Sequence, residues 1–166
     1  THNMNPKGEY KGTTYEYGWN KDGWPASSMR SYLSTDIYNA LPSALQSAII
    51  DTKVVSGHGS SDSANFTSTD KLYLLDAREV YGTSFTSSYN TSKDSERQLD
   101  YYSAQGVTTS NYSGAIKQLN GSNSWWWLRA AYSSNGNDFY SVDNTGDWDY
   151  NYAYYAIGVS PAFRIA

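Results

Sequence analysis

The sequence predicts a single α+β domain, and three observations lead to that class. Helical spacing of apolar residues occurs early in the chain, whereas short strand-like blocks dominate its second half. No internal repeat or linker divides the 166 residues, a length that suits one domain with a real core. Aromatic residues make up 16% of the chain, which argues against a disordered polymer. We therefore expect short helices packed on small antiparallel sheets, with long loops between them.

The first fifty residues supply most of the expected helix. Alternating aromatic residues over 15–19 first indicate a short strand. A helix follows, with Ser27 or Ser28 as its N-cap. Its apolar side chains recur at helical spacing, at Met29, Leu33 and Ile37. Pro42 ends this helix and can begin a second short one over residues 43–50.

Strand-like blocks and polar loops make up most of the remaining chain. Residues 52–57 indicate a strand, and the polar residues 56–70 indicate a loop without periodicity. The block 72–75 indicates a buried strand that turns into a short helix. Residues 83–114 are expected to form a long excursion with one helix near 95–104. SWWWLRAA and IGVSPAFRIA are the last two strand-like blocks.

Large side chains in these last blocks are expected to have structural roles. Trp125, Trp126 and Trp127 are consecutive, so in a strand they cannot all face the same way. We expect one or two of them in the core and one at the boundary of the surface that residues 132–157 form. Arg129 and Arg164 are expected to hold loops through carboxylates or backbone carbonyls.

The segment between the two blocks, residues 132–157, has an unusual composition. It is rich in Tyr, Asn, Asp and Ser, and it holds four Asp with no Lys or Arg. The whole net charge of −4 therefore resides in this segment, which counts against a nucleic-acid site there. Turn-rich β structure alone can enrich these residue types. The same composition is also typical of an antibody paratope, because Tyr gives rigid contact area and the polar residues give adaptable hydrogen bonds.

The sequence offers little support for catalytic or cofactor chemistry. The two histidines, His2 and His58, lie in no recognisable nucleophile motif, and the chain has no cysteine. A zinc site needs three or four His, Cys or carboxylate ligands, and no glycine-rich phosphate loop occurs. We therefore expect no enzyme, no catalytic residue and no cofactor.

One short pattern is similar to part of a calcium loop. Asp147-x-Asp149-x-Asn151 matches the first half of such a loop. The residue after Asn151 is Tyr rather than the turn glycine, and the twelfth position is Gly158 rather than the bidentate Glu. Because both of these elements are absent, we expect no metal site.

Several blocks resemble a bacterial and phage domain family. WWWLRAA (125–131) and GVSPAFRIA (158–166) are similar to that family's final W-W-L-R-S and G-V-R-P-A blocks. GWPASSMRSYL, LPSALQSAI and DKLYLLDAREVYG are similar to its W-x-x-S-x-x-R-x-x-L block, its first helices and its D-K-L-F-L-L-S-x-x-E-V block. The chain departs from the pattern with Ala130 and Asp76 where Ser is usual, and with Ser160 where Arg is usual.

The resemblance implies a C-type lectin fold, related to that of the formylglycine-generating enzymes. Those enzymes use cysteines, which this chain lacks, so their activity is not implied. Members of this fold also serve as variable proteins of diversity-generating retroelements, in which template adenines are miscopied and Asn codons in a C-terminal window change. One change at either of the first two bases of an Asn codon gives Asp, Tyr, His, Ser, Thr or Ile. Residues 132–157 consist largely of these types together with Asn.

Under this hypothesis the segment interleaves a fixed framework with a variable ligand-binding surface. The framework residues are expected at Phe139, Val142, Gly146, Trp148, Ala153 and Ala156. The expected ligand-binding residues are Tyr132, Ser134, Asn135, Asn137, Asp138, Tyr140, Asp143, Asn144, Asp147, Asp149, Tyr150, Asn151, Tyr152, Tyr154, Tyr155 and Ile157. The expected partner is a protein or glycan on another cell or particle, and the oligomeric state stays open.

Residues 1–166 are expected to form one domain, the C-terminal part of a longer protein on a phage tail or a bacterial surface. No run of 18 apolar residues occurs, so direct membrane insertion is not expected. Two alternatives remain open. One is a carbohydrate-binding module of fixed specificity, in which Trp148 and nearby tyrosines stack on sugar rings. The other is an assembly domain whose tyrosines form a permanent subunit interface.

Overall fold

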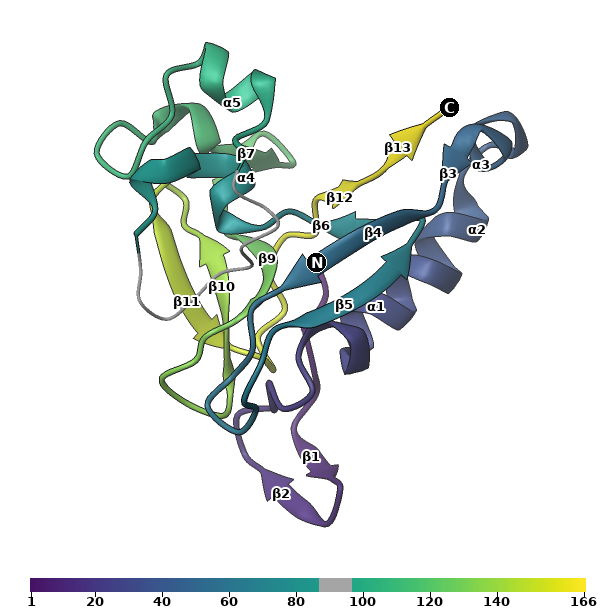
Figure 1. The fold of residues 1–166 in the computed structure, drawn as a ribbon, viewed down its shortest axis with the longest axis vertical. Coiled ribbons are helices and arrows are strands. Elements are labelled where there is room, and N and C mark those ends of the chain that lie inside the picture. Colours follow the sequence, from purple (N-terminus) through teal and green to yellow (C-terminus); the bar gives the residue numbers. More distant parts are fainter. Residues whose placement is uncertain (87–96) are drawn as a thin grey trace.

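The computed structural model describes residues 1–86 and 97–166 and has an α+β fold with short helices and small antiparallel sheets, as the sequence predicts (Figure 1). The first part comprises β1 (Gly8–Tyr10), β2 (Thr13–Tyr15), η1 (Trp24–Ala26), α1 (Ser28–Tyr32), η2 (Leu33–Ile37), α2 (Tyr38–Ala40), α3 (Ser43–Ala48), β3 (Ile49–Ile50), β4 (Thr52–Ser56), β5 (Phe66–Asp70), β6 (Tyr73–Leu74), α4 (Ala77–Tyr81) and η3 (Gly82–Ser84). The second part comprises α5 (Asp100–Ala104), η4 (Ser113–Ala115), β7 (Lys117–Leu119), β8 (Ser122–Ser124), β9 (Trp126–Ala131), β10 (Asp138–Val142), β11 (Trp148–Tyr152), β12 (Pro161–Ala162) and β13 (Arg164–Ile165).

A three-stranded antiparallel sheet in the order β11-β10-β9 is the largest sheet among the described residues. Tyr140 lies opposite Tyr150 across β10 and β11, and Val142 lies opposite Trp148. All five residues of β10 are buried, so the middle strand is covered on both faces. Figure 1 shows this sheet on one side of the molecule, with β4, β5 and the first helices on the other side.

The two faces of β9 pack into two different hydrophobic cores. Trp126 and Leu128 belong to the first core, together with residues of α4 and α5. Trp127 belongs to the second core, together with Met29 and Leu33 from the first helical region. Side chains of a strand alternate between its faces, so two adjacent tryptophans serve two cores. The expected core positions of Trp126 and Trp127 are confirmed, whereas the half-buried Trp125 lies beside Lys117 and Val159, in a pocket that no residue of 132–157 lines.

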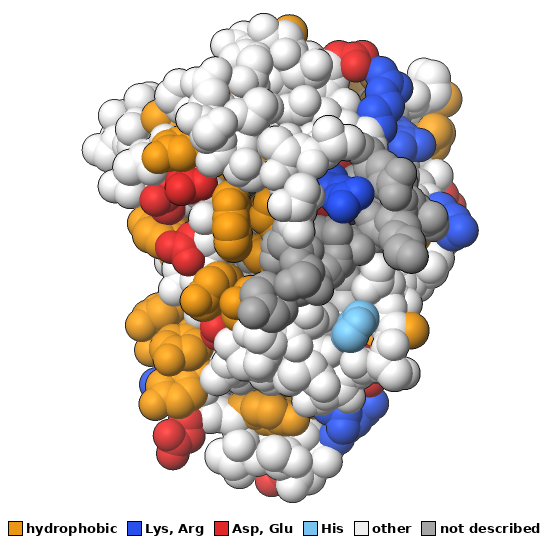
Figure 2. Space-filling model, turned by 60° about the vertical axis from the view of Figure 1, so that its left-hand side comes forward, with side chains coloured by type: hydrophobic (Ala, Val, Ile, Leu, Met, Phe, Trp, Pro, Cys, Tyr) orange, Lys and Arg blue, Asp and Glu red, His pale blue; other side chains and the backbone are white. Residues whose placement is uncertain are grey.

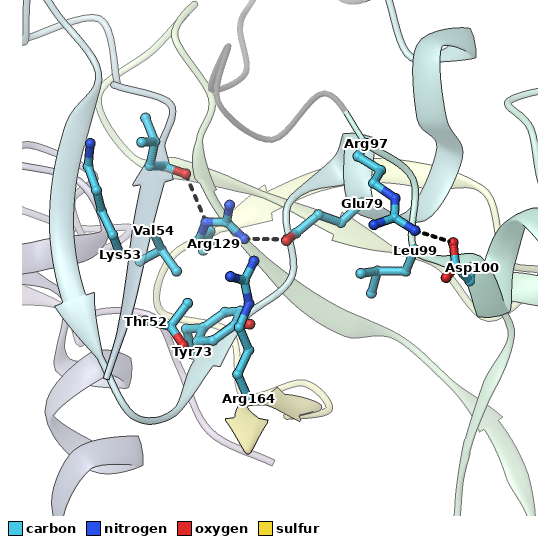
Figure 3. Close-up of a pocket in the computed structure, with 11 residues that line it drawn as sticks. Thr52, Lys53, Val54, Tyr73, Glu79, Arg97, Leu99, Asp100, Arg129 and Arg164 are labelled. Carbon is cyan, nitrogen blue, oxygen red and sulfur yellow. Dashed lines mark hydrogen bonds and ion pairs between the residues drawn. The ribbon is translucent and has the colours of Figure 1, made fainter. Parts of the chain in front are cut away.

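The side chain of Arg129 joins β9 to three other elements. It is 1% exposed. Nε donates to the carbonyl of Val55 at 3.0 Å, and Nη1 donates to the carbonyl of Leu74 at 2.9 Å. Nη1 also lies 2.6 Å from a carboxylate oxygen of Glu79 (Figure 3). Arg129 therefore bonds to a carboxylate and to backbone carbonyls as predicted, but these bonds hold β4, β6 and α4 rather than loops.

The helical predictions for the first half are largely confirmed. Ser27 is the N-cap of α1, and its hydroxyl accepts a hydrogen bond from the backbone N–H of Arg30. The second helix begins after Pro42 but is shorter than predicted, because Ile49 and Ile50 form β3, which pairs with β13.

Two predictions for local structure are wrong. Strand β2 ends at Tyr15, and Tyr17 lies in a turn rather than in a strand over 15–19. The predicted loop 56–70 contains β5, which pairs with β4 along its whole length. Strand β5 has only partly buried or exposed side chains before Asp70, so it carries no apolar alternation that would reveal it. The helix expected near 95–104 is α5, although residues 95 and 96 lie outside the described residues.

Across residues 1–86 and 97–166, the helices are too short and too polar for any of them to cross a bilayer.

Candidate functional site

Most of segment 132–157 forms the hairpin of β10 and β11. Its turn depends on Asp143, whose carboxylate accepts hydrogen bonds from the backbone N–H groups of Thr145 and Asp147. Gly146 adopts a φ of 94°, and a Cβ there would lie 2.2 Å from the carbonyl oxygen of Tyr112. The expected turn at Gly146 is therefore confirmed, and only glycine fits this close approach.

Strand β11 lies at the edge of the three-stranded sheet and places its side chains on two faces. Trp148, Tyr150 and Tyr152 share one face, and Asp149 and Asn151 share the other. At the Trp148 end the first face packs on the first core. At the other end it opens to solvent, where Tyr150 is 42% exposed and Tyr152 is 37% exposed.

Four exposed tyrosines and the half-buried Tyr154 form a cluster here, which we call the tyrosine patch: Tyr17, Tyr150, Tyr152, Tyr154 and Tyr155. The ring of Tyr17 stacks on Tyr152 with centroids 4.5 Å apart, and the rings of Tyr154 and Tyr155 also lie 4.5 Å apart. Tyr150 stacks on the buried Tyr132 at 4.1 Å. Figure 2, which brings the β11 side forward, shows orange side chains gathered on this face with acidic ones between them.

The backbone beneath the tyrosine patch is held by main-chain hydrogen bonds. The carbonyl of Ala153 accepts from the N–H groups of Met4 and Asn5, and its own N–H donates to Asn137. The N–H of Tyr154 donates to the carbonyl of Tyr17. Ala153 is fully buried, as expected for a framework residue. The segment is therefore anchored through bonds that do not involve the tyrosine side chains.

Gly18 permits this close packing. It has a φ of 74°, and a Cβ there would lie 2.7 Å from the carbonyl oxygen of Asn5 and 2.9 Å from the backbone nitrogen of Tyr154. The N-terminal region thus passes directly under the tyrosine patch.

Most of the predicted ligand-binding residues are at least partly exposed, and they lie in the β10–β11 hairpin, in the loop before it or in the chain after it. The exposed members are Ser134, Asn144, Tyr150, Tyr152 and Tyr155. The half-buried members are Asn135, Asn137, Asp143, Asp147, Asp149, Asn151, Tyr154 and Ile157.

Three of the predicted ligand-binding residues are buried and lie under the surface instead. Tyr140 is 0% exposed because it occupies the middle strand and packs in the first core. Tyr132 is 8% exposed beneath Tyr150, and Asp138 is 4% exposed at the start of β10. Burial removes Tyr140 from direct contact with a ligand. Tyr132 supports Tyr150 from below, whereas Asp138 still reaches the surface as part of a pocket wall.

The expected framework residues are mostly buried. Phe139 and Val142 are 0% exposed and face the second and first core respectively. Trp148 is half-buried against the first core. Ala156 is exposed, so it does not serve as a packing residue.

A small pocket of about 240 Å³ opens beside the tyrosine patch. It is lined by Asp138, Tyr150, Asn151, Tyr152 and Tyr155. Burial raises the pKa of the Asp138 carboxyl, and the charge of Asp149 raises it further, while a hydrogen bond from Asn135 opposes both effects. Burial also raises the pKa of Asp147. The closeness of Tyr132 raises the pKa of Tyr150.

The part-match to a calcium loop has no structural counterpart. Asp149 and Asn151 lie in the extended strand β11, and Asp147 immediately precedes it, rather than in a helix-flanked loop. Among residues 1–86 and 97–166, no group of three or more His, Cys, Asp or Glu side chains could hold a metal ion.

Tyr17 and Lys7 belong to this surface, although neither was among the predicted ligand-binding residues. Tyr17 is 42% exposed and bridges Tyr152 and Tyr154. The ammonium nitrogen of Lys7 lies 4.2 Å from the centroid of the Tyr154 ring. Both residues come from the N-terminal region, which only the fold brings beside the C-terminal segment.

Another cavity, of about 270 Å³, lies between β4, β6 and α4 and contains several charged side chains (Figure 3). Arg129 and Glu79 form its inner wall, and Arg97 and Asp100 form an exposed ion pair at its edge. Arg164 also points into it. The charged residues of this cavity include two ion pairs with each other, Arg129 with Glu79 and Arg97 with Asp100. None of the predicted ligand-binding residues lines the cavity.

A family model described as a domain of unknown function (DUF6273) matches residues 7–166 of the chain. The match covers all the helices and strands of the described fold. No curated protein matches the chain, and no solved structure matches it either.

Proposed function

Because the chain belongs to the DUF6273 family, whose description states no activity, we propose a function from the chain's own surface. The protein is a recognition domain that binds a protein or glycan on another cell or particle through the tyrosine patch. Its fold is of the C-type lectin type, and its C-terminal segment is diversified by a retroelement. In a phage the domain would belong to a tail protein, and in a bacterium to a surface protein.

The exposed tyrosine patch is the observation that carries this proposal. Tyr17, Tyr150 and Tyr155 are each at least 40% exposed, although large aromatic side chains are ordinarily drawn into the core. Such rings bring large contact area at low conformational entropy, and tyrosine is enriched among binding hot spots. A surface that is aromatic, acidic and anchored from below is suited to binding rather than to catalysis.

The distribution of burial supports diversification of this segment. Ala, Gly, Phe and Val require two changes of an Asn codon, and Trp cannot be reached from it. Phe139, Val142 and Ala153 are fully buried, and Gly146 occupies the turn that needs glycine. The exposed positions carry Tyr, Ser and Asn, which are Asn or one change away from it. This division has exceptions, because Ala156 is exposed, and residues one change away from Asn are buried at Tyr132, Asp138, Tyr140 and Ser141.

The first test uses the natural gene. We expect a near copy of the DNA for residues 125–166 close by, with AAC or AAT at the codons of the exposed positions and a reverse transcriptase beside it. If the locus has no such repeat, the proposed diversification is wrong. The proposal that the tyrosine patch binds a partner would then stand without it.

The second test separates surface from core. We expect the triple variant Tyr152→Ala, Tyr154→Ala, Tyr155→Ala to stay folded, with a loss of unfolding free energy of about 1 kcal/mol per residue or less. The control Tyr140→Ala removes a fully buried ring and is expected to lose about 3–5 kcal/mol. Urea unfolding followed by circular dichroism measures both. If the triple variant shows no cooperative unfolding transition, or loses clearly more than about 3 kcal/mol in total, the tyrosines are structural and the proposal is wrong.

A carbohydrate-binding module of fixed specificity is the second candidate, because exposed tyrosine rings also stack on sugars. This candidate would be favoured if the protein bound one reproducible group of sugars on a glycan array and its gene had no nearby repeat. A permanent subunit interface predicts instead a tight oligomer that the triple variant dissociates, which light scattering detects.

A further inference from the structure

We propose that the pocket lined by Asp138, Tyr150, Asn151, Tyr152 and Tyr155 binds the cationic end of an arginine or lysine side chain of a protein partner. This inference rests on the proposed recognition function and names the chemistry that the tyrosine patch selects. Three independent features of the described residues lead to it.

The first feature is the arrangement of rings around the pocket. Tyr150 and Tyr152 project from the same face of β11, and Tyr155 follows after the strand ends. The centroids of Tyr152 and Tyr155 lie 6.0 Å apart. The faces of aromatic rings carry negative potential, so several rings around one space attract a cation. A pocket of about 240 Å³ accommodates an ammonium or guanidinium group.

The second feature is an uncompensated carboxylate at the pocket. Asp138 lies opposite Tyr152 in the register of β10 and β11, so both side chains share the same face. Its Oδ2 accepts a hydrogen bond from the amide of Asn135 at 2.7 Å. Its Oδ1 is buried and has no hydrogen-bond partner among the described residues. A buried carboxylate without a counter-charge is unfavourable, and a bound cation would supply that counter-charge.

The third feature is the charge of the surroundings. Segment 132–157 carries Asp138, Asp143, Asp147 and Asp149 and no basic residue. The one basic side chain recorded over the patch within the described residues is Lys7, whose ammonium group lies above the ring of Tyr154. The protein thus already holds a cation of its own on a neighbouring ring, while the pocket itself lacks one. Negative potential over such a surface also speeds the approach of a basic partner.

These features favour a cation over a sugar as the ligand of this pocket. Neutral sugars gain from ring stacking, but they do not neutralise Asp138. Acidic ligands are repelled by the four aspartates. A basic side chain satisfies the rings and the carboxylate together.

The experiment titrates the intact chain with the peptide acetyl-Gly-Arg-Gly-amide at constant ionic strength and follows the tyrosine ring signals by NMR. The matched probe is the same peptide with citrulline in place of arginine, which is nearly isosteric but neutral. We expect the citrulline peptide to bind about tenfold more weakly, because it loses the cation–π and charge interactions. Equal affinities of the two peptides would overturn the proposal.

Two variants locate the site. Asp138→Asn and Tyr152→Leu are each expected to weaken arginine-peptide binding about fivefold to tenfold. The control Asp149→Asn removes a charge that acts on Asp138 only from the opposite face of β11, so it is expected to change affinity by no more than about twofold. If Asp149→Asn weakens binding as much as Asp138→Asn, the effect is general charge and the pocket assignment is wrong. Tyr152→Leu keeps the test decisive if Asp138→Asn disturbs the fold.

A further arm uses choline as the probe. Choline binding in the absence of arginine-peptide binding would identify a lipid headgroup site and overturn the assignment to a protein partner. Failure of every cation, with the triple tyrosine variant still folded, would reject this inference alone. Unfolding of the triple variant would instead reject the recognition surface on which it rests.

Discussion

At the scale of single residues, the buried carboxyl of Asp76 stabilises the start of a helix, but its burial destabilises the folded state at neutral pH. It is fully buried and caps α4, where its Oδ1 accepts the backbone N–H of Arg78 and Glu79 completes a capping box. Its Oδ2 has no hydrogen-bond partner among the described residues. Burial raises the pKa of Asp76 to about 6, although the charge of Arg129 opposes this.

The raised pKa gives a prediction for Asp76→Ser, which keeps an N-cap hydroxyl and removes the titration. The folded state holds the Asp76 proton more tightly than the unfolded chain does, so stability is unaffected below about pH 4 and falls as the pH rises to about 6. Relative to Asp76→Ser, the natural chain should therefore lose on the order of 2 kcal/mol of unfolding free energy between pH 4 and pH 7. Urea unfolding at the two pH values measures this.

Asp22→Ser provides the control of opposite sign. A hydrogen bond from Lys11 lowers the pKa of Asp22 below its ordinary 3.8, so its contribution is present above about pH 4 and is lost as the pH falls further. Its effect therefore requires a third measurement below pH 4, and Asp22→Ser should leave the change between pH 4 and pH 7 nearly unaltered. The prediction for Asp76 fails if both variants alter that change equally.

At the scale of elements, the turn of the β10–β11 hairpin depends on Gly146. The Tyr81 hydroxyl donates to the carbonyl of Gly146 at 2.6 Å. The backbone of Tyr112 occupies the space that a Cβ on Gly146 would need. The hairpin that carries the tyrosine patch is thus fixed at its turn to two other parts of the chain.

Gly146→Ala should therefore be severe. We expect a loss of more than about 2 kcal/mol of unfolding free energy, because the added Cβ meets backbone and φ is positive. Gly121→Ala is the matched control, since Gly121 also has a positive φ but open space beside it, and should lose only about 1 kcal/mol. Similar losses for both would show that the contact with Tyr112 does not matter. Thermal or urea unfolding distinguishes the two cases.

At the scale of the whole molecule, the two hydrophobic cores share the sheet that divides them. Trp126 and Leu128 fill one core, and Trp127 fills the other, from a single strand. If β9 leaves one core, its side chains also leave the other core. The fold is therefore expected to unfold as one unit.

Leu128→Ala in the first core and Leu33→Ala in the second core test this coupling. Both side chains are fully buried, so each variant should lose about 2–5 kcal/mol. Each variant should still show one transition, with the same midpoint by circular dichroism and by tryptophan fluorescence. Separated midpoints in either variant would show that the two cores unfold independently.

The sequence predicted those features that rest on local pattern. The cap at Ser27, the buried strand around Trp126 and the turn at Gly146 each have a physical cause within a few residues. Strand β5 escaped prediction because its pairing with β4 depends on backbone bonds and not on apolar side chains. The same limit applies to the site. Composition indicated the tyrosines of β11, but the burial of Tyr140 and the contribution of Tyr17 depend on how distant segments meet.

The main-chain bonds beneath the tyrosine patch have a practical consequence. Met4, Asn5, Tyr17 and Asn137 hold the chain at Ala153 and Tyr154 by N–H and carbonyl groups, which every non-proline residue possesses. Random codons at positions 150, 152, 154 and 155 should therefore give a library in which most members are folded and soluble. A domain without cysteine, anchored in this way, is a ready starting point for selecting new binders in the laboratory.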